Sequence, residues 1–283
     1  MKLSSLIFVL VALVFIGCAS SPNVSESTTD IVPAVVEEVK KEPVKIVTTV
    51  YYPVKVVSYF GDGVKDEYTV KSYNEDGSVL LKEELFNSED VIQQSVVYES
   101  GKKSLYSAAG ALVSYELISV DADGNVLKKE KYDNKDVLLS ISEYQYENGM
   151  KTVWKVFNES KSLLSTTKYI YTDNNLTRID SLSPGGEIEE YFELGYDSNG
   201  LLVDNIHYNA EGKVQDSRSF EYKDSFLVME LIKRKNGSVL RKIMYLNDQF
   251  GNPIETVFMD AGDNVQERLT TDYESREEIS YEE

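Results

Sequence analysis

Apolar, β-branched and aromatic residues occur in short runs along the chain, and small polar residues with glycine separate these runs. In the stretch 196–212 the pattern occurs twice, as Tyr196 followed by Asp-Ser-Asn-Gly and Tyr208 followed by Asn-Ala-Glu-Gly. Asp and Asn bond to nearby backbone, and Gly adopts a positive φ without steric cost, so both sequences are typical of turns. The residues between them are of the types that strands prefer. The stretch therefore predicts a β-hairpin.

The same unit recurs from Val44 to about residue 273, with a turn roughly every 12 residues. Two units make a repeat of about 25 residues, which is typical of repeat architectures. Short turns join antiparallel neighbours, so the strands are expected to follow one another in the sheet. The expected turns lie near residues 62, 77, 89, 101, 110, 124, 135, 149, 160, 174, 186, 200, 212, 224, 237, 251 and 262.

The two faces of the expected sheet both carry apolar residues. In the run 187–196, Phe192, Leu194 and Tyr196 share one face, whereas Tyr191 shares the other with glutamates. This pattern favours a curled sheet with a drier concave side over a flat sheet. We predict an all-β fold of tandem antiparallel β-hairpin repeats, forming a long, curled and twisted meander sheet. A four-bladed β-propeller is the alternative, because four strands of this length would make one blade.

The N-terminus has a short basic start and an apolar run over residues 6–16, which is too short to span a membrane. The run ends at Phe15-Ile16-Gly17-Cys18, which resembles the lipobox of bacterial lipoproteins. In that family the cysteine is acylated, for example with palmitate, and becomes the first residue of the mature chain. The resemblance implies that residues 1–17 are a signal peptide and that Cys18 is the lipidation site and membrane anchor. An ordinary secretory signal with an incidental cysteine is the alternative.

The composition of the rest of the chain predicts three further segments. Residues 18–43 are rich in Ser, Thr, Pro and Glu, which predicts a lipidated flexible tether before the β-hairpin repeat domain of residues 44–273. Residues 274–283 are expected to be a frayed acidic tail. Cys18 is the only cysteine, so no intramolecular disulfide can form. The net charge of −19 argues against nucleic acid as a partner, because no basic stripe is present to neutralise phosphates.

A second resemblance concerns the repeats. Tyr196-Asp197-Ser198-Asn199-Gly200 is similar to the turn of tandem YD repeats of the Rhs type, whereas Tyr132-Asp133 keeps the dipeptide but ends in Asp136. Residues 60–273 also resemble, more loosely, the MORN-like hairpin repeats of bacterial surface and antitoxin proteins. The resemblance implies a β-hairpin array that acts as a shell, a scaffold or a binding surface. It implies no catalytic activity.

Few residues suggest chemistry. His207 is the only histidine, which removes Ser-His-Asp and Cys-His schemes, and it is expected to be a partly exposed strand residue. The run 121–125 begins like a calcium loop, but Val126 and Tyr132 stand where an EF-hand requires Gly and Glu, so a hairpin turn is favoured. Trp154 is expected to pack in a core. If it is exposed among tyrosines, it becomes the best candidate for contact with a partner.

These observations predict a membrane-anchored lipoprotein of the bacterial cell envelope, on the periplasmic or the surface side. It is expected to act without catalysis, cofactor or metal, as a binding or scaffold module for an envelope protein partner. Two alternatives remain open. A carrier of apolar molecules would need a continuous apolar concave face. A glycan-active enzyme of carboxylate type would need two carboxylates about 5–10 Å apart across a cleft.

Overall fold

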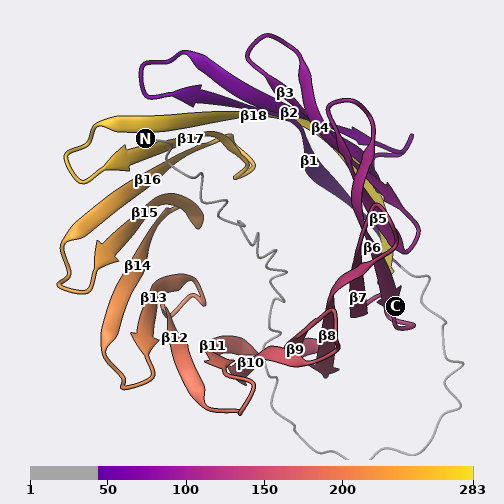
Figure 1. The fold of residues 1–283 in the computed structure, drawn as a ribbon. Helices are drawn as coiled ribbons and strands as arrows, with labels where there is room; N and C mark the ends of the chain where they lie inside the picture. The colour runs from indigo at the N-terminus through magenta and orange to yellow at the C-terminus, as the bar shows by residue number, and fades with distance from the viewer. Residues whose placement is uncertain (1–43, 283) are drawn as a thin grey trace, which may run out of the picture. The chain divides into compact units, whose positions relative to one another are not determined.

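The computed structural model describes residues 44–282, which form one antiparallel sheet of eighteen strands. Each strand pairs with the next strand along the chain, and β1 also pairs with β18. This last pairing closes the sheet into a barrel, as Figure 1 shows. The predicted long, curled and twisted meander sheet is therefore wrong, because the sheet is closed, and so is the alternative of a four-bladed propeller. The signal peptide, Cys18 and the tether of residues 18–43 lie outside the described residues.

The strands are joined in order by short turns. They are β1 (Val44–Phe60), β2 (Lys65–Tyr73), β3 (Leu80–Asn87), β4 (Ile92–Glu99), β5 (Lys102–Ser107), β6 (Leu112–Val120), β7 (Val126–Asp133), β8 (Leu138–Glu147), β9 (Met150–Asn158), β10 (Leu163–Thr172), β11 (Asn175–Leu182), β12 (Ile188–Tyr196), β13 (Leu202–Asn209), β14 (Val214–Lys223), β15 (Phe226–Arg234), β16 (Val239–Asn247), β17 (Pro253–Asp260) and β18 (Val265–Glu282). Within this range the structure has no helix with the length and apolar character needed to cross a membrane.

The turns form as their sequences predict. After β12, the Gly200 N–H donates to the Asp197 carbonyl at 3.1 Å and the Asp197 N–H donates to the Leu201 carbonyl at 2.9 Å. The Asp197 carboxylate accepts the N–H groups of Asn199 and Leu201, and Gly200 has a φ of 78°. This geometry is a type I turn followed by a left-handed residue, the usual three-residue hairpin loop. Each turn expected from the sequence lies between two strands.

The barrel wall is a single layer with almost no core. Among the described residues, only Ile141, Leu182, Leu194 and Ile243 are buried hydrophobic side chains. Most other strand residues are half-buried against neighbours on the same face. The fold is therefore stabilised chiefly by strand pairing, by cross-strand side-chain pairs and by closure, which leaves no unpaired edge around the ring.

The first and last strands are much longer than the others. β1 has 17 residues and β18 has 18, whereas β8 has 10. The Tyr52 hydroxyl donates to Glu274 and the Ser58 hydroxyl donates to Glu267, which places the two strands side by side. Residues 274–282, expected to be a frayed tail, are therefore strand, because β1 supplies a partner for them. β1 continues through Pro53 without interruption.

Candidate functional site

Strand register divides the side chains between two faces of the barrel wall, because residues paired across strands point to the same side. We name the faces after one residue of each. The His207 face bears Tyr144, Trp154, Tyr169, Phe192, His207, Asp216, Arg218, Glu230 and Tyr245. The Arg178 face bears Arg178, Asp180, Tyr191, Glu193 and Tyr208.

Trp154 lies in a cluster of three aromatic rings and one lysine, which we call the aromatic cluster (Tyr144, Lys151, Trp154 and Tyr169). The Tyr144 and Trp154 rings stack across β8 and β9, with centroids 6.2 Å apart and an interplanar angle of 10°. The Lys151 ammonium lies 4.3 Å from the Tyr169 ring centroid and 6.0 Å from that of Tyr144. All four residues are half-buried, so the cluster is accessible to a partner.

Two donors in the aromatic cluster are poorly satisfied. The Trp154 indole N–H is buried and has no hydrogen-bond partner among the described residues. Burial lowers the pKa of Lys151, and the nearby Tyr144 offsets this only in part. An unpaired buried donor is costly, and an amine with a lowered pKa has lost part of its hydration. The cluster is thus suited to a group that supplies hydrogen-bond acceptors.

His207 lies between two carboxylates on the same face. Its Nδ1 is 3.0 Å from Asp216 Oδ2 on β14, and its Nε2 is 3.1 Å from Glu190 Oε2 on β12. The ring also stacks on Phe192 at 4.5 Å. Burial lowers the pKa of His207, but the hydrogen bonds to Asp216 and Glu190 outweigh it, so the pKa is raised above its usual value. The structure therefore favours an imidazolium that bridges three strands.

A third polar group on this face surrounds Glu230, which is only 5% exposed. Its carboxylate accepts a hydrogen bond from Arg218 Nη1 at 2.9 Å and one from the Tyr245 hydroxyl at 3.4 Å. Burial and the adjacent Glu230 raise the pKa of Tyr245, so its hydroxyl stays protonated at neutral pH. The buried carboxylate is thus paired on both sides, as a buried charge requires.

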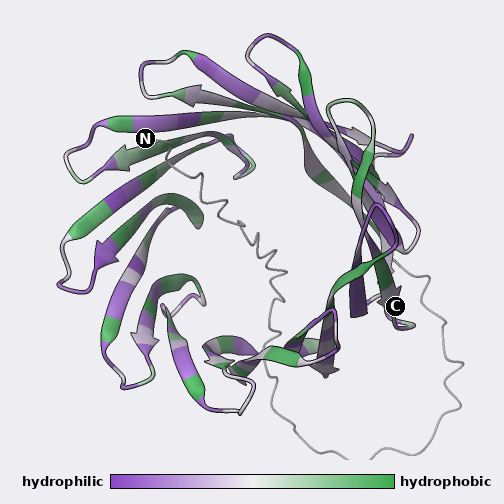
Figure 2. Ribbon diagram, viewed as in Figure 1, coloured by the Kyte–Doolittle hydropathy of each residue, from purple (hydrophilic) through white to green (hydrophobic). Residues whose placement is uncertain are grey.

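The Arg178 face is also charged. Arg178 Nε lies 2.6 Å from Asp180 Oδ1, and its Nη1 lies 3.6 Å from Glu193 Oε1. The guanidinium carbon is 3.9 Å from the Tyr191 ring centroid, and that ring stacks on Tyr208 at 4.8 Å. Charged and aromatic side chains therefore occupy the middle of the strands on both faces. Figure 2 shows the same mixture of hydrophilic and hydrophobic positions around the ring.

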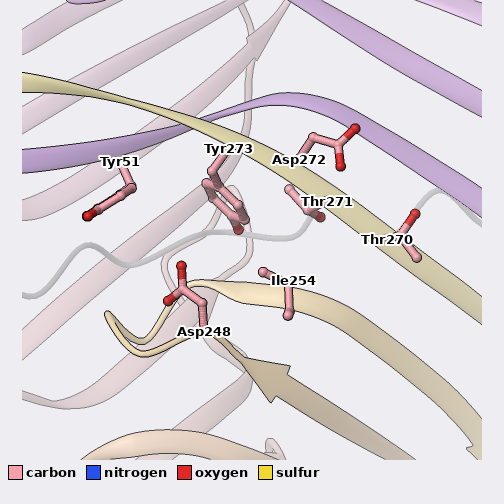
Figure 3. Close-up of a pocket in the computed structure, with 7 residues that line it drawn as sticks. All are labelled: Tyr51, Asp248, Ile254, Thr270, Thr271, Asp272 and Tyr273. Atoms are coloured by element: carbon pink, nitrogen blue, oxygen red, sulfur yellow. The ribbon is translucent and has the colours of Figure 1, made fainter.

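One pocket, with a volume of about 410 Å³, lies where β1 and β18 extend past the other strands. Figure 3 shows the residues that line it, which are Tyr51, Asp248, Ile254, Thr270, Thr271, Asp272 and Tyr273. The Asp248 carboxylate accepts hydrogen bonds from its own turn, chiefly from Asn252, and these lower its pKa. Because this carboxylate already has its donors, the pocket is a structural feature of the seam between β1 and β18.

The sequence-predicted residues have different outcomes. Cys18 lies outside the described residues, so its lipidation stays a prediction. Trp154 is half-buried among tyrosines, and its contact with a partner also stays a prediction. The run 121–125 is the turn between β6 and β7, in which Asp121 accepts two backbone N–H groups. The residues Glu190 and Asp216 beside His207 were missed, because each becomes its neighbour only through strand pairing.

The comparisons with known proteins assign no family. No protein-family profile matches the chain, and no curated protein matches it. The chain is similar to a porin-like protein from Bacteroides vulgatus, at 11% identity and a TM-score of 0.36, covering 80% of this chain and 99% of that one. A porin-like protein from Bacteroides uniformis has 10% identity and a TM-score of 0.28, covering 81% and 98%.

A third similar structure is TcdB2-TccC3 without its hypervariable C-terminal region, at 13% identity and a TM-score of 0.28. The match covers 75% of this chain and 15% of that one, so the chain spans a small part of that protein's length. At these identities and TM-scores the likenesses carry no functional information. The resemblance to YD and MORN-like repeats stays a prediction as well.

Proposed function

We propose that the protein is a cell-envelope lipoprotein whose barrel is a non-enzymatic binding or scaffold module, held at a membrane by lipid on Cys18. The envelope location rests on the lipobox-like residues 15–18. The binding role rests on the aromatic cluster, in which Trp154, Tyr144 and Tyr169 gather around Lys151 on one face of the wall. Half-buried aromatic side chains of this kind are the usual anchors of protein contacts.

The chemistry of the aromatic cluster suggests what the partner offers. Lys151 and the Trp154 indole both supply donors, and the rings supply a flat apolar surface. A partner segment with an apolar or aromatic side chain next to a carbonyl or carboxylate would match both features. Although the chain carries a net charge of −19, the cluster itself presents a positive group. We therefore propose an envelope protein with such a segment as the partner.

The carrier alternative is less well supported. Arg218 and Glu230 on one face, and Arg178 and Asp180 on the other, place ion pairs in the middle of strands. A lining for apolar molecules, like the lipid-facing wall of a membrane barrel, is a continuous apolar band. The enzyme alternative would need two carboxylates free to act across a cleft, whereas Glu190 and Asp216 are both hydrogen-bonded to His207.

The test is a pull-down from envelope extracts with a chain of residues 19–283, which contains the whole compact unit of residues 45–282. We expect recovery of a specific protein, and loss of that protein with Trp154→Ala. Tyr191→Ala is the matched control, because it removes a stacked aromatic residue from the Arg178 face. Trp154 is the only tryptophan, so its fluorescence should change when the purified partner is added. Recovery of bound lipid and no protein would support the carrier instead.

A further inference from the structure

β1 and β18 continue beyond the ring as a two-stranded extension, which we call the ribbon (residues 44–52 and 274–282). The register of β1 with β2 covers Lys55 to Tyr59, so the N-terminal half of β1 has β18 as its only partner strand among the described residues. The side chains from Lys45 to Thr49 are exposed, as are those from Glu277 to Tyr281. The ribbon thus presents an open strand edge on each side.

Two turns fix the base of the ribbon on the barrel. Tyr51 stacks on Phe250 of the β16–β17 turn, with centroids 4.6 Å apart. On the other side, Arg276 Nη1 donates to the Gly77 carbonyl of the β2–β3 turn at 2.9 Å. The Tyr52 ring also packs on Tyr73 of β2, with centroids 4.6 Å apart. Farther along the ribbon, the side chains of residues 45–49 and 277–281 are exposed. An anchored ribbon with open edges is a template for pairing with another strand.

The residues of β1 that direct their backbone N–H and C=O groups to the open edge can be identified. The Pro53 carbonyl accepts a hydrogen bond from the Tyr73 hydroxyl of β2, which places it on the β2 side of the strand. Residues two apart on a strand direct their N–H and C=O groups to the same side. Val47, Thr49 and Tyr51 therefore direct theirs to the open edge, whereas Thr48 directs its groups to β18.

The two edges differ in charge. Residues 274–282 of β18 hold four acidic residues and one arginine, so two such edges would repel each other. Residues 44–52 of β1 hold Lys45 as their only charge and are otherwise apolar or hydroxyl-bearing, with Ile46 39% and Val47 48% exposed. Only the β1 edge can therefore pair with a copy of itself without like charges in contact.

We propose that two copies of this chain associate through the β1 edges of their ribbons, antiparallel about a two-fold axis at Thr48. In this register Val47 pairs with Thr49 of the second copy through the outward backbone groups. Ile46 lies opposite Val50, and Lys45 lies opposite Tyr51. Thr48 faces its own copy as a non-hydrogen-bonded pair, in which side chains approach most closely.

The length of the ribbon makes this association compatible with the acidic surface. Nine residues at about 3.4 Å each separate the two rims by roughly 30 Å. This is more than three Debye lengths at physiological ionic strength, so the repulsion between the two acidic barrels is largely screened. An isologous contact also closes on itself as a dimer and does not continue as a filament.

The test measures the mass of the 19–283 chain by analytical ultracentrifugation, since residues 45–282 form one compact unit. We expect a dimer for the unchanged chain. Thr48→Lys and Thr48→Glu should each weaken the dimer at least tenfold, because each places like charges opposite each other. An equimolar mixture of the two variants should restore a dimer that contains one of each. Thr167→Lys, on the barrel wall, is the charge control and should leave the dimer unchanged.

Three results would overturn the proposal. One is a monomeric unchanged chain at concentrations of about 100 μM, in the weak range of specific association. Another is a dimer that persists in both Thr48 variants, because its contact would then lie elsewhere. The third is failure of the mixture to associate when each variant alone is monomeric, which would exclude a two-fold axis at Thr48. Circular dichroism that matches the unchanged chain shows that each variant is folded.

Discussion

The Tyr196 hydroxyl donates a hydrogen bond of 2.9 Å to the carbonyl of Leu176, twenty residues earlier in the chain. Tyrosines near the ends of four other strands make the same contact with the residue twenty positions earlier, and a sixth does so more weakly at 3.4 Å. These tyrosines are Tyr73, Tyr146, Tyr171, Tyr222 and Tyr273. Each bond ties a strand to the strand that precedes it in the chain, which gives the repeated tyrosine a structural role.

Tyr196→Phe tests this bond. The variant keeps the ring and loses the hydroxyl, so we expect the free energy of unfolding to fall by about 0.5–1.5 kcal/mol. Urea denaturation followed by circular dichroism measures the loss. Tyr191→Phe is the control, because it lies on the same strand and its hydroxyl makes no hydrogen bond within residues 44–282. An equal loss in both variants would mean that the bond to Leu176 does not stabilise the barrel.

The pKa of His207 gives a pH prediction. Because the pKa is raised above 6.5 in the folded state, the contribution of the imidazolium to stability is complete below that pH. It is lost as the pH rises through the raised value. We therefore expect the urea midpoint to fall across this window, and the fall to be absent in His207→Gln.

A second variant tests whether the two carboxylates cause the raised pKa of His207. The double substitution Glu190→Gln and Asp216→Asn removes both acceptors and should abolish the fall while leaving the histidine in place. His207 is the only histidine, so no other side chain has its ordinary pKa in this window. A midpoint that rises with pH in the unchanged chain would contradict the two ion pairs.

Closure of the barrel can be tested at Gly61, which lies in the turn between β1 and β2. A Cβ added there would lie 2.1 Å from the Val265 carbonyl oxygen of β18, and a strand backbone cannot move aside cheaply. We expect Gly61→Ala to destabilise the protein by about 1–3 kcal/mol and to increase hydrogen exchange in β1 and β18. Gly195→Ala is the control, because its nearest contact is 3.7 Å away. Equal exchange in the two variants would mean that β1 does not close the ring.

Contacts between residues close in the chain could be predicted from the sequence, whereas contacts between distant residues could not. Asp197 and Gly200 identify their turn because the relevant hydrogen bonds lie within five residues. Closure depends on contacts such as that between Ser58 and Glu267, which are 209 residues apart, and an alternating pattern is the same in an open and a closed sheet. Residues 274–282 were expected to fray because they are acidic. They form a strand because β1, which is rich in β-branched residues, pairs with them.

The neighbours of His207 could be predicted in part from the sequence. The turn at 210–212 is a three-residue loop, and such a loop sets the register of its two strands next to the turn. The loop leads to the pairing of Tyr208 with Val214, and an irregularity in register at the next position then places Asp216, instead of Gln215, opposite His207. Glu190 is different, because it lies diagonal to His207 on the preceding strand β12, where Phe192 is the direct partner. Its contact depends on the side-chain conformations of both residues, which no pattern of residue types specifies.

Lipidation of Cys18 gives the last prediction. Expressed in full in a bacterium that processes lipoproteins, the unchanged chain should fractionate with membranes and resist a high-salt wash, because acyl chains bind by burial in the bilayer. Cys18→Ser should leave an unprocessed precursor and release the protein from that fraction. The substitution removes no disulfide, because Cys18 is the only cysteine, so the folding of residues 44–282 should be unchanged. Firm membrane association of the Cys18→Ser variant would mean that a part of the chain other than the lipid holds it there, and would sink the lipoprotein interpretation.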